Sequence, residues 1–342
     1  MRILLIQTAF IGDVALTTPL ITALRKRFAG STFHIVTTPQ GAELLAGLPD
    51  VVCHALDKKK TGLLQSLRQA RESLGTEAFD FVFCVHRSLR SLWLGKSISA
   101  KRRVAFRSMA SRILGYETVP YPSYNESVHY VDKTLALLGV FGSVPPRTRP
   151  ELVVEQRDVE SVAIKLASIG RDSKYIVLSP FSVWGTKMWF ADRYAALGVS
   201  IANRYKCPIV VIGGADAREA IVAQTIVEKI QAGGGEALSL VGRTSLGELK
   251  QVIHGATLVI ANDSAPVHIA AAFDVPTVAI FGPTVRKWGF FPLATNSMIV
   301  ERQELPCRPC HIHGPPKCPL GHFKCMDQIQ VEDVVSAVEK II

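Results

Sequence analysis

An acidic residue follows the first apolar run of the chain, in the segment QTAFIGDVALTTPLI (residues 7–21). Asp13 lies where the predicted first strand gives way to a helix, directly after Gly12. A carboxylate in this position has two interpretations. It can cap the helix and complement its dipole, or it can face a ligand and accept a proton from an attacking hydroxyl group. The glycine allows close approach of a ligand or a positive φ.

A second turn of this kind lies in the other half of the chain, in NDSAPVHIAAAF (residues 262–273). Asp263, Ser264 and Ala265 form the predicted turn between a strand and a helix. Pro266 occupies the first helical turn, where its missing N–H costs nothing. The backbone N–H groups and the dipole of such a helix end form a site for phosphate. The alternative is a helix that Asp263 or Ser264 caps.

More polar residues of the second half follow predicted strands. Lys187 stands beside Thr186 on a loop that leaves the same sheet edge as the Asp263 turn, where an ammonium group can neutralise a departing diphosphate. A loop lysine is otherwise simply solvated. Glu219 opens another helix, where a carboxylate binds ribose hydroxyls or favours the helix amino terminus. His268 is either a ligand or, as is commoner for a lone histidine, a packed core residue.

A cysteine-rich segment, residues 305–326, lies near the end of the chain. Cys307, Cys310, Cys318 and Cys325 have the spacing C-x2-C-x7-C-x6-C, with three histidines between them. This spacing suits a structural zinc or iron site. Buried thiols, or a disulfide formed after isolation, are the alternatives. In either case we expect no catalytic role for the segment.

Alternating apolar runs and helical patterns position these residues. Strands are predicted at residues 1–7, 32–38, 51–56, 80–85, 102–106, 174–181, 207–214, 237–242, 256–263 and 275–282. Helices between them imply parallel sheets with right-handed crossovers, so we predict an α/β fold. The proline-rich stretch VPPRTRP marks a boundary, which gives two domains, residues 1–150 and 151–342. Ligands of such sheets bind outside the carboxyl ends of the strands, so we expect the active site in a cleft between the halves.

The sequence also excludes several functions. Neither GxGxxG nor GxxxxGK[ST] occurs, so a dinucleotide or P-loop site has little support. No apolar run reaches the length of a membrane span. The start of the chain does not have a signal-peptide pattern, and the cysteines do not form an extracellular disulfide pattern. We therefore expect a cytoplasmic protein.

The net charge of +10 is concentrated in the first half. Up to residue 150 there are 20 Lys+Arg against 10 Asp+Glu, and beyond it 19 against 19. Basic clusters occur at residues 58–60, at Arg87 and Arg90, and at residues 101–103 with Arg107. This half should attract an anionic partner. No nucleic-acid-binding module accompanies the charge, so we expect no nucleic-acid partner.

Taken together, the motifs resemble the ADP-heptose:lipopolysaccharide heptosyltransferases of glycosyltransferase family 9. The resemblance spans nearly the whole chain. It rests on GD in the first loop, TKxW at 186–189, GRTSLGEL at 242–249, NDSAPVHIAAAFDVPTVAIFGPT at 262–284 and CRPCHIHGPPKCPLGHFKCM at 307–326. The last block looks most like the heptosyltransferase II branch. The resemblance implies the GT-B fold, in which two Rossmann-like domains with parallel sheets face each other across a central cleft. The first domain would bind the acceptor and the second the nucleotide-sugar.

Residue by residue, the resemblance makes Asp13 the general base for the acceptor hydroxyl. Lys187 would bind the diphosphate as a catalytic cation, together with the backbone amides near Ser264 and Ala265. Where the family commonly has glycine this chain has Ala265, which keeps the amide donor and loses the backbone freedom of glycine. The resemblance places the other predicted site residues around the nucleotide-sugar: Thr186, Glu219, Thr244, Asp263 and His268.

The implied reaction is the inverting transfer of heptose from ADP-L-glycero-β-D-manno-heptose to the inner core of lipopolysaccharide. No metal and no other cofactor is required, and we assign no metal ligands. The acceptor, a lipid A/Kdo inner core, is anionic and membrane-anchored, which implies peripheral association with the cytoplasmic face of the inner membrane.

Other interpretations stay open. The chain could be a family 9 transferase with another sugar donor or a protein acceptor, or a GT-B sugar-nucleotide epimerase. A different class is a non-enzymatic metal- or nucleic-acid-binding protein built around the cysteines and the basic half.

Overall fold

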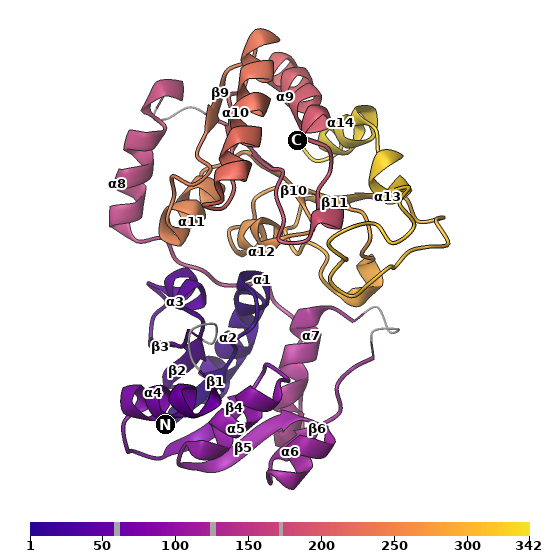
Figure 1. Ribbon diagram of the computed structural model, residues 1–342. Coiled ribbons are helices and arrows are strands. Elements are labelled where there is room, and N and C mark those ends of the chain that lie inside the picture. The colour runs from indigo at the N-terminus through magenta and orange to yellow at the C-terminus, as the bar shows by residue number, and fades with distance from the viewer. Residues whose placement is uncertain (58–61, 124–127, 171–173) are drawn as a thin grey trace. The chain divides into compact units, whose positions relative to one another are not determined.

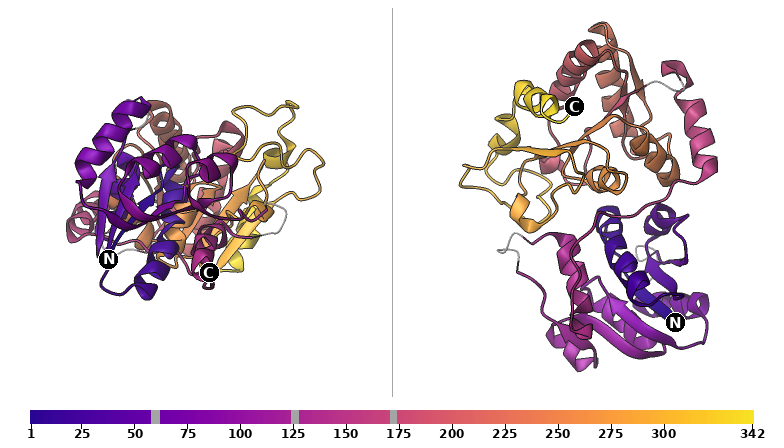
Figure 2. Two further views of the ribbon diagram at one scale, coloured as in Figure 1. Left: turned by 90° about the horizontal axis from the view of Figure 1, so that it is seen from below. Right: turned by 180° about the vertical axis from the view of Figure 1, so that it is seen from behind.

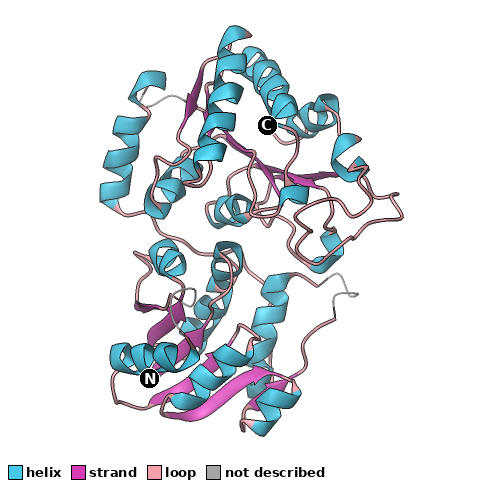
Figure 3. Cartoon of the chain, viewed as in Figure 1, coloured by secondary structure: helices cyan, strands magenta, loops and turns pink. Residues whose placement is uncertain are grey.

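The computed structural model describes residues 1–57, 62–123, 128–170 and 174–342 (Figure 1). These residues form two compact units, Met1–Val153 (unit 1) and Val154–Ile342 (unit 2). Each unit is built on a six-stranded sheet whose neighbouring strands are parallel. Helices flank the sheet of each unit (Figures 2 and 3). The predicted α/β class with parallel sheets is therefore confirmed.

The sheet of unit 1 has the strand order β3-β2-β1-β4-β5-β6. Its strands are β1 (Arg2–Ile6), β2 (Thr32–Thr37), β3 (Val51–Ala55), β4 (Phe79–Cys84), β5 (Ala100–Phe106) and β6 (Glu117–Val119). The chain proceeds from β1 toward β2 and β3, then returns to β4 on the other side of β1. The direction of winding thus reverses between β1 and β4, which makes this point the topological switch point of the sheet.

The helices of unit 1 connect these strands. They are α1 (Ile11–Ala15), α2 (Thr18–Arg27), α3 (Pro39–Leu45), α4 (Leu63–Leu74), α5 (Leu89–Ser97), α6 (Met109–Ile113) and α7 (Tyr130–Leu135), which the 3-10 helix η2 (Ala136–Phe141) extends. Apolar residues of β1 and β4, among them Leu4, Ile6 and Val82, form the core with residues of α4 and α5. Ile3 and Leu5, which point to the other face of the sheet, are also buried. Burial on both faces explains why the strands read as continuous apolar runs.

The sequence pattern VALTTPLITALRKRF (residues 14–28) predicts a single helix. This prediction is wrong, because the structure has two helices there, α1 and α2. Pro19 has no N–H and cannot continue the helical hydrogen-bond ladder. Two hydroxyls satisfy carbonyls at the break: Thr17 Oγ1 donates to the carbonyl of Asp13, and Thr18 Oγ1 donates to that of Ala15, each at 2.8 Å. The break leaves α1 as a short separate helix directly after β1.

Unit 2 repeats the architecture with the strand order β12-β11-β10-β7-β8-β9. Its strands are β7 (Ile176–Ser179), β8 (Ile209–Val211), β9 (Ala237–Ser239), β10 (Leu258–Asn262), β11 (Thr277–Phe281) and β12 (Ser297–Glu301). Its helices are α8 (Gln156–Lys165), α9 (Ala191–Tyr205), α10 (Ala217–Ala232), α11 (Leu246–His254), α12 (Ala265–Ala272), α13 (Lys324–Asp327) and α14 (Val331–Glu339), with 3-10 turns η3 (Ala167–Ile169), η4 (Gly185–Lys187) and η5 (Arg286–Trp288). The switch point of this sheet lies between β7 and β10.

The core of unit 2 ties the cysteine-rich end of the chain to the sheet. Trp189 is buried, and its indole Nε1 donates to the carbonyl of Ile329 at 3.0 Å. Cys325, Met326 and Val334 belong to the same apolar cluster. The loop that carries Trp189 is therefore fixed from two directions, by the sheet and by the end of the chain. Over the described ranges, none of the helices combines the length and the apolar composition that crossing a bilayer requires.

Candidate active site

The switch point of unit 2 brings two distant motifs together. Strands β7 and β10 are adjacent and parallel, while β8 lies beyond β7 and β11 beyond β10. The loop after β7 carries Thr186 and Lys187, and the turn after β10 carries Asp263. Loops that leave neighbouring strands in opposite directions open a crevice, and ligands of α/β sheets bind there.

Lys187 and Asp263 form a buried ion pair at this crevice. Lys187 Nζ lies 2.6 Å from Asp263 Oδ2, and the two side chains are 12% and 7% exposed. Thr284, which follows β11, donates its hydroxyl to the same carboxylate oxygen at 2.6 Å. The buried carboxylate thus has both a counter-ion and a hydrogen-bond donor. Both are needed, because a buried charge without partners is strongly destabilising. Thr284 was not a predicted site residue, although it ends the motif NDSAPVHIAAAFDVPTVAIFGPT.

Asn262 holds the loop that carries Lys187. Its Nδ2 donates to the carbonyl of Pro180 at 2.8 Å, and its Oδ1 accepts from the backbone N–H of Trp189 at 3.1 Å and from the hydroxyl of Tyr194 at 3.2 Å. Pro180 and Trp189 stand on either side of Lys187 in the sequence. One buried amide therefore fixes both ends of the loop. The sequence-based site did not include this residue.

Ser264 does not cap the amino end of α12 with its side chain, so this alternative from the sequence is wrong. Ser264 is the N-cap residue but makes no side-chain capping bond; its hydroxyl donates instead to the carbonyl of Asn262 at 3.2 Å. Ala265 is the first residue of the helix, so its backbone conformation does not need glycine. A helix end without a side-chain cap presents N–H groups and the positive end of the dipole to an anion.

His268 lies in α12 near the ion pair. It is 5% exposed. Burial lowers the pKa of His268 to about 4; the Asp263 carboxylate opposes this and the Lys187 ammonium adds to it. The imidazole is therefore neutral at pH 7. His268 is therefore a packed residue, as one of the two interpretations of the sequence expected. It is also within electrostatic reach of Lys187 and Asp263, so a place near a bound ligand is compatible with this packing.

Thr186 is directed at another part of the chain. It is buried, and its hydroxyl donates to the carbonyl of Pro315 at 2.5 Å. The contact joins the loop after β7 to the cysteine-rich segment.

Glu219 and Thr244 lie along the same edge of the sheet, on the side of β8 and β9. Glu219 is in the first turn of α10, and its Oε2 accepts the backbone N–H of Gly214 at 2.7 Å. Thr244 lies in the loop between β9 and α11, and Gly242 of that loop lies next to Gly214. The structure therefore brings the first turn of α10, with Glu219, close to the loop of Thr244, on the opposite side of β7 from β10.

Asp13 lies at the switch point of unit 1. It is the third residue of α1, whose N-cap is Phe10, so the N-cap interpretation of Asp13 is wrong. The carboxylate is still in the first helical turn, where the dipole favours a negative charge. Gly12 is inside the same helix and has no positive φ. Asp13 is partly exposed at the carboxyl end of β1.

A hydroxyl network lies on the other side of this switch point. His86 follows β4, and its Nδ1 is 3.0 Å from the hydroxyl oxygen of Thr8, 3.2 Å from that of Ser91 and 3.4 Å from that of Ser88. Three hydroxyls around one ring nitrogen fix the orientation of the imidazole. None of these residues was predicted from the sequence, because scattered serine, threonine and histidine residues have no diagnostic spacing.

The structure separates the predicted basic clusters of unit 1. Arg87 and Arg90 follow β4 and Arg107 follows β5, so we call these three the carboxyl-edge arginines. The guanidinium carbon of Arg87 lies 4.0 Å from the ring centroid of Tyr121, a cation–π contact that orients it.

The cluster at residues 101–103 lies at the start of β5, at the opposite edge of the sheet. Lys101 pairs with Asp80 at 2.8 Å, and Arg102 pairs with Glu117 at 2.6 Å. Arg103 donates to backbone carbonyls, including that of Ile98 at 2.6 Å. These charges are used within unit 1, away from Asp13. The cluster at residues 58–60 lies outside the described residues.

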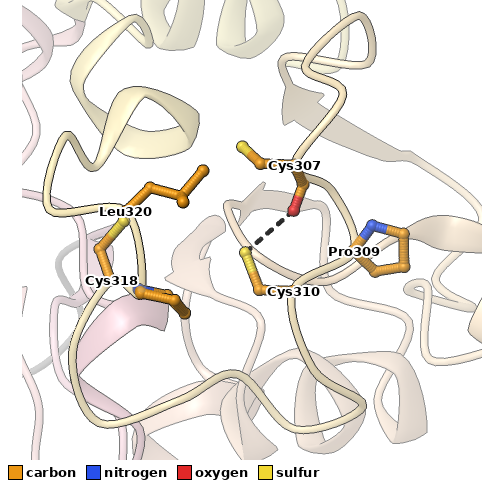
Figure 4. A pocket seen from close by; sticks show the side chains of 6 residues that line it. Cys307, Pro309, Cys310, Cys318 and Leu320 are labelled. Atoms are coloured by element: carbon orange, nitrogen blue, oxygen red, sulfur yellow. Dashed lines mark hydrogen bonds between the residues drawn. The ribbon is translucent and has the colours of Figure 1, made fainter.

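Three cysteines of the cysteine-rich segment, Cys307, Cys310 and Cys318, line a cavity of about 250 Å³ (Figure 4). Cys310 Sγ donates to the carbonyl of Cys307 at 3.1 Å. Burial, and then the neighbouring thiolate charges, raise the pKa of Cys325 to about 11. The cysteines of the described chain are free thiols. Within the described ranges, no three His, Cys, Asp or Glu side chains are arranged to hold a metal ion.

Each unit thus carries polar side chains at the carboxyl edge of a parallel sheet, beside its switch point. Both sheets have the Rossmann-like strand order, with the reversal at the switch point, and two such units in one chain agree with the GT-B class. Residues 67–316 match the family described as Glycosyltransferase family 9 (heptosyltransferase). The chain belongs to this family and is a glycosyltransferase, which confirms the predicted family and enzyme class.

Two relatives and one solved structure illustrate the similarity. Lipooligosaccharide heptosyltransferase 2 of Campylobacter jejuni is 22% identical over 342 residues, 100% of this chain and 99% of that protein. Lipopolysaccharide heptosyltransferase 1 of Pseudomonas aeruginosa is 28% identical over 324 residues, 91% of this chain and 86% of that protein. The structure of E. coli ADP-heptose LPS heptosyltransferase II has a TM-score of 0.77 at 18% identity and covers 100% of this chain and 98% of its own. The structural similarity agrees with the GT-B fold.

Proposed function

We propose that this protein transfers L-glycero-D-manno-heptose from ADP-heptose to the inner core of lipopolysaccharide, with inversion at the anomeric carbon. The observation that carries the proposal is the Lys187–Asp263 pair beside the amino end of α12, at the switch point of unit 2. Family membership makes a nucleotide-sugar the natural ligand of this site. The names of the relatives, which are lipopolysaccharide or lipooligosaccharide heptosyltransferases, support the acceptor class.

The donor diphosphate would bind between Lys187 and the first amides of α12. An ammonium group has three N–H donors, so its contact with Asp263 is compatible with a second contact to a phosphate oxygen. The Asp263 carboxylate then holds the ammonium in place before the donor arrives. Fixed dipoles and cations of this kind stabilise the negative charge that develops on a leaving diphosphate.

The nucleoside would lie toward β8 and β9. Glu219 offers a carboxylate and Thr244 a hydroxyl along that stretch of the edge, both suited to ribose hydroxyls. His268 lies within electrostatic reach of the ion pair and stays neutral, and Thr186 holds the loop in place through its bond to Pro315.

In the proposed reaction the acceptor hydroxyl oxygen attacks the anomeric carbon of the donor while the bond to the diphosphate oxygen breaks. ADP leaves with the electron pair, and the hydroxyl proton passes to the Asp13 carboxylate. Displacement from the opposite face converts the β-linked donor to an α-linked product. The reaction is neutral in redox terms, and the side chains named here supply the charges that it needs, so we propose that no metal or other cofactor takes part.

The acceptor would be held on unit 1. Its phosphates and Kdo carboxylates are anionic, and the carboxyl-edge arginines lie at the same sheet edge as Asp13. Each basic residue near an anionic membrane surface contributes on the order of 1 kcal/mol. We therefore propose peripheral association with the cytoplasmic face of the inner membrane through this edge.

Within the heptosyltransferases, we propose the second heptose transfer. The cysteine-rich segment supports this choice, because its pattern looks most like the heptosyltransferase II branch. The full-length relative from C. jejuni also has that name.

The test is a transfer assay with ADP-heptose and a series of truncated core acceptors, read by mass spectrometry. We expect one heptose to be added to an acceptor that already carries one heptose, and no reaction with the heptose-free Kdo–lipid A acceptor. Addition to the heptose-free acceptor would contradict the assigned subtype. Turnover of other sugar nucleotides in preference to ADP-heptose would contradict the donor.

A further inference from the structure

The cysteine-rich segment reaches the proposed donor site. Residues 311–316, here called the strap, lie against the loop that carries Lys187. Besides the bond from the Thr186 hydroxyl to the carbonyl of Pro315, the backbone N–H of Thr186 donates to the same carbonyl at 3.4 Å. Gly314 has a φ of +80°, and a side chain there would meet Thr186, Pro283 and the stem of Lys187. Glycine at 314 is thus what allows the strap to lie this close to Lys187.

The strap places an imidazole against the loop that carries Lys187. The ring of His313 stacks on that of Trp184, with centroids 5.7 Å apart and an interplanar angle of 9°. Trp184 belongs to the same loop as Lys187, so the stack joins strap and loop a second time. His313 is exposed, so its ring is accessible to a ligand.

The pKa of His313 depends on the charges of the ion pair. Partial burial lowers the pKa of His313, the Lys187 ammonium and then His311 lower it further, and the Asp263 carboxylate opposes them. The charges of both members of the buried pair therefore affect the pKa of His313. The imidazole is neutral at pH 7 and carries one N–H donor.

We propose that His313 binds the diphosphate of the nucleotide donor, as a residue of the site that the strap adds to Lys187 and the α12 amides. This inference rests on the proposed function and names one more residue of the same site. The charge balance supports it. Lys187 and Asp263 together are neutral, so a diphosphate with at least two negative charges needs further donors. An imidazole N–H beside Lys187 is such a donor, and an arriving diphosphate would raise its proton affinity and strengthen the bond.

The position also accounts for the cysteine-rich segment, for which no catalytic role was expected. Cys310, just before the strap, is held by two bonds: its thiol donates to the carbonyl of Cys307 at 3.1 Å, and its backbone N–H donates to the carbonyl of Pro283 at 3.3 Å. The segment would then serve the reaction through the strap, while the thiols take no part in the chemistry.

The experiment is calorimetric titration of the full chain with ADP and with AMP. The variants are His313→Ala and His313→Gln, and the matched control is His322→Ala. His322 is an exposed histidine of the same segment whose Nδ1 accepts the backbone N–H of Lys324. Thermal melting of each variant verifies folding. AMP lacks the second phosphate, so comparing the two ligands separates a contact to the diphosphate from a general loosening of the strap.

We expect His313→Ala to weaken ADP binding about 10-fold or more, the size of effect typical for a lost hydrogen bond to a charged group. AMP binding should change much less. His313→Gln, which keeps an N–H donor, should recover part of the loss, and His322→Ala should bind both ligands as the unchanged chain does.

Two results would overturn the inference while leaving the proposed function intact: unchanged ADP affinity in His313→Ala, or equal losses for ADP and AMP. If the unchanged chain binds no ADP at all, the proposed function and this inference both fall.

Discussion

The ammonium of Lys187 lies 2.6 Å from the carboxylate of Asp263, although the two residues come from loops after different strands, β7 and β10. Neither charge would be stable at this depth without the other. Each residue therefore depends on the other, and the pair fixes the position of the Lys187 ammonium group next to the turn that precedes α12.

The first prediction concerns this pair. Lys187→Ala should weaken ADP binding at least 10-fold and destabilise the fold by about 3 kcal/mol, because it leaves a buried carboxylate without its counter-ion. Calorimetry and urea unfolding measure the two effects. Lys229→Ala is the matched control, since it breaks a surface pair with Asp192 that contributes about 1 kcal/mol or less. Equal behaviour of the two variants would show that Lys187 is not a binding residue.

The second prediction separates two groups of basic residues in unit 1. Replacing Arg87, Arg90 and Arg107 with glutamine should raise the KM for the acceptor about 10-fold or more and leave ADP affinity unchanged, because these arginines share the sheet edge of Asp13. The same change at residues 101–103 should leave the acceptor KM close to its original value, since those side chains lie at the opposite edge and are paired within unit 1. Steady-state kinetics measures both KM values. A larger rise in the acceptor KM for the variant at residues 101–103 would contradict the assignment of the acceptor to the carboxyl edge.

The third prediction concerns pH. The folded state keeps His268 deprotonated down to about pH 4, whereas in the unfolded chain the histidine takes up its proton near 6.5. Between pH 6.5 and 4 the unfolded state thus binds more protons than the folded state. The contribution of His268 to the free energy of unfolding is therefore complete above pH 6.5 and is lost as the pH falls toward 4. The loss should be about 3 kcal/mol. Urea unfolding at pH 7 and at pH 4.5 should show a smaller acid loss in His268→Gln than in the unchanged chain, and identical losses would contradict the burial argument.

The fourth prediction concerns metals. Transfer should proceed at an unchanged rate in excess EDTA, because Lys187 and the amide end of α12 supply the charge stabilisation that the diphosphate needs. The assay is the same mass-spectrometric measurement with and without chelator. Inhibition that added Mg²⁺ or Zn²⁺ reverses would show that a metal takes part.

Much of the fold could be predicted because its signals are local. Buried parallel strands such as β1 and β10 read as apolar runs, and the proline-rich stretch at residues 144–150 lies just before the division between the units. Predictions failed where a local signal was overlooked or weak. Pro19 broke one expected helix into α1 and α2. The strand β6 was missed because it has only three residues, and β12 because it is mostly half-buried and has polar residues at both ends.

For the candidate site, motif spacing identified the residues that β7 and β10 bring together. It could not identify their partners. Thr284, Asn262 and His86 act through contacts with residues far away in the sequence, and nothing in the sequence near them indicates those contacts. The cap considered for Asp13 was wrong because the helix begins before it, after the N-cap residue Phe10. Ser264 is the N-cap residue of α12, but its hydroxyl donates to the carbonyl of Asn262 and does not cap the helix, and composition does not fix that choice.

The most direct test of the account is transfer by Asp13→Asn, measured by mass spectrometry beside its ADP affinity. The amide keeps the size of the side chain but cannot take the proton of the acceptor hydroxyl, so we predict a fall in turnover of about 10² to 10⁴-fold with ADP binding unchanged. Glu72→Gln, an exposed carboxylate of α4, serves as the control. Normal turnover in Asp13→Asn would contradict the claim that this residue is the base.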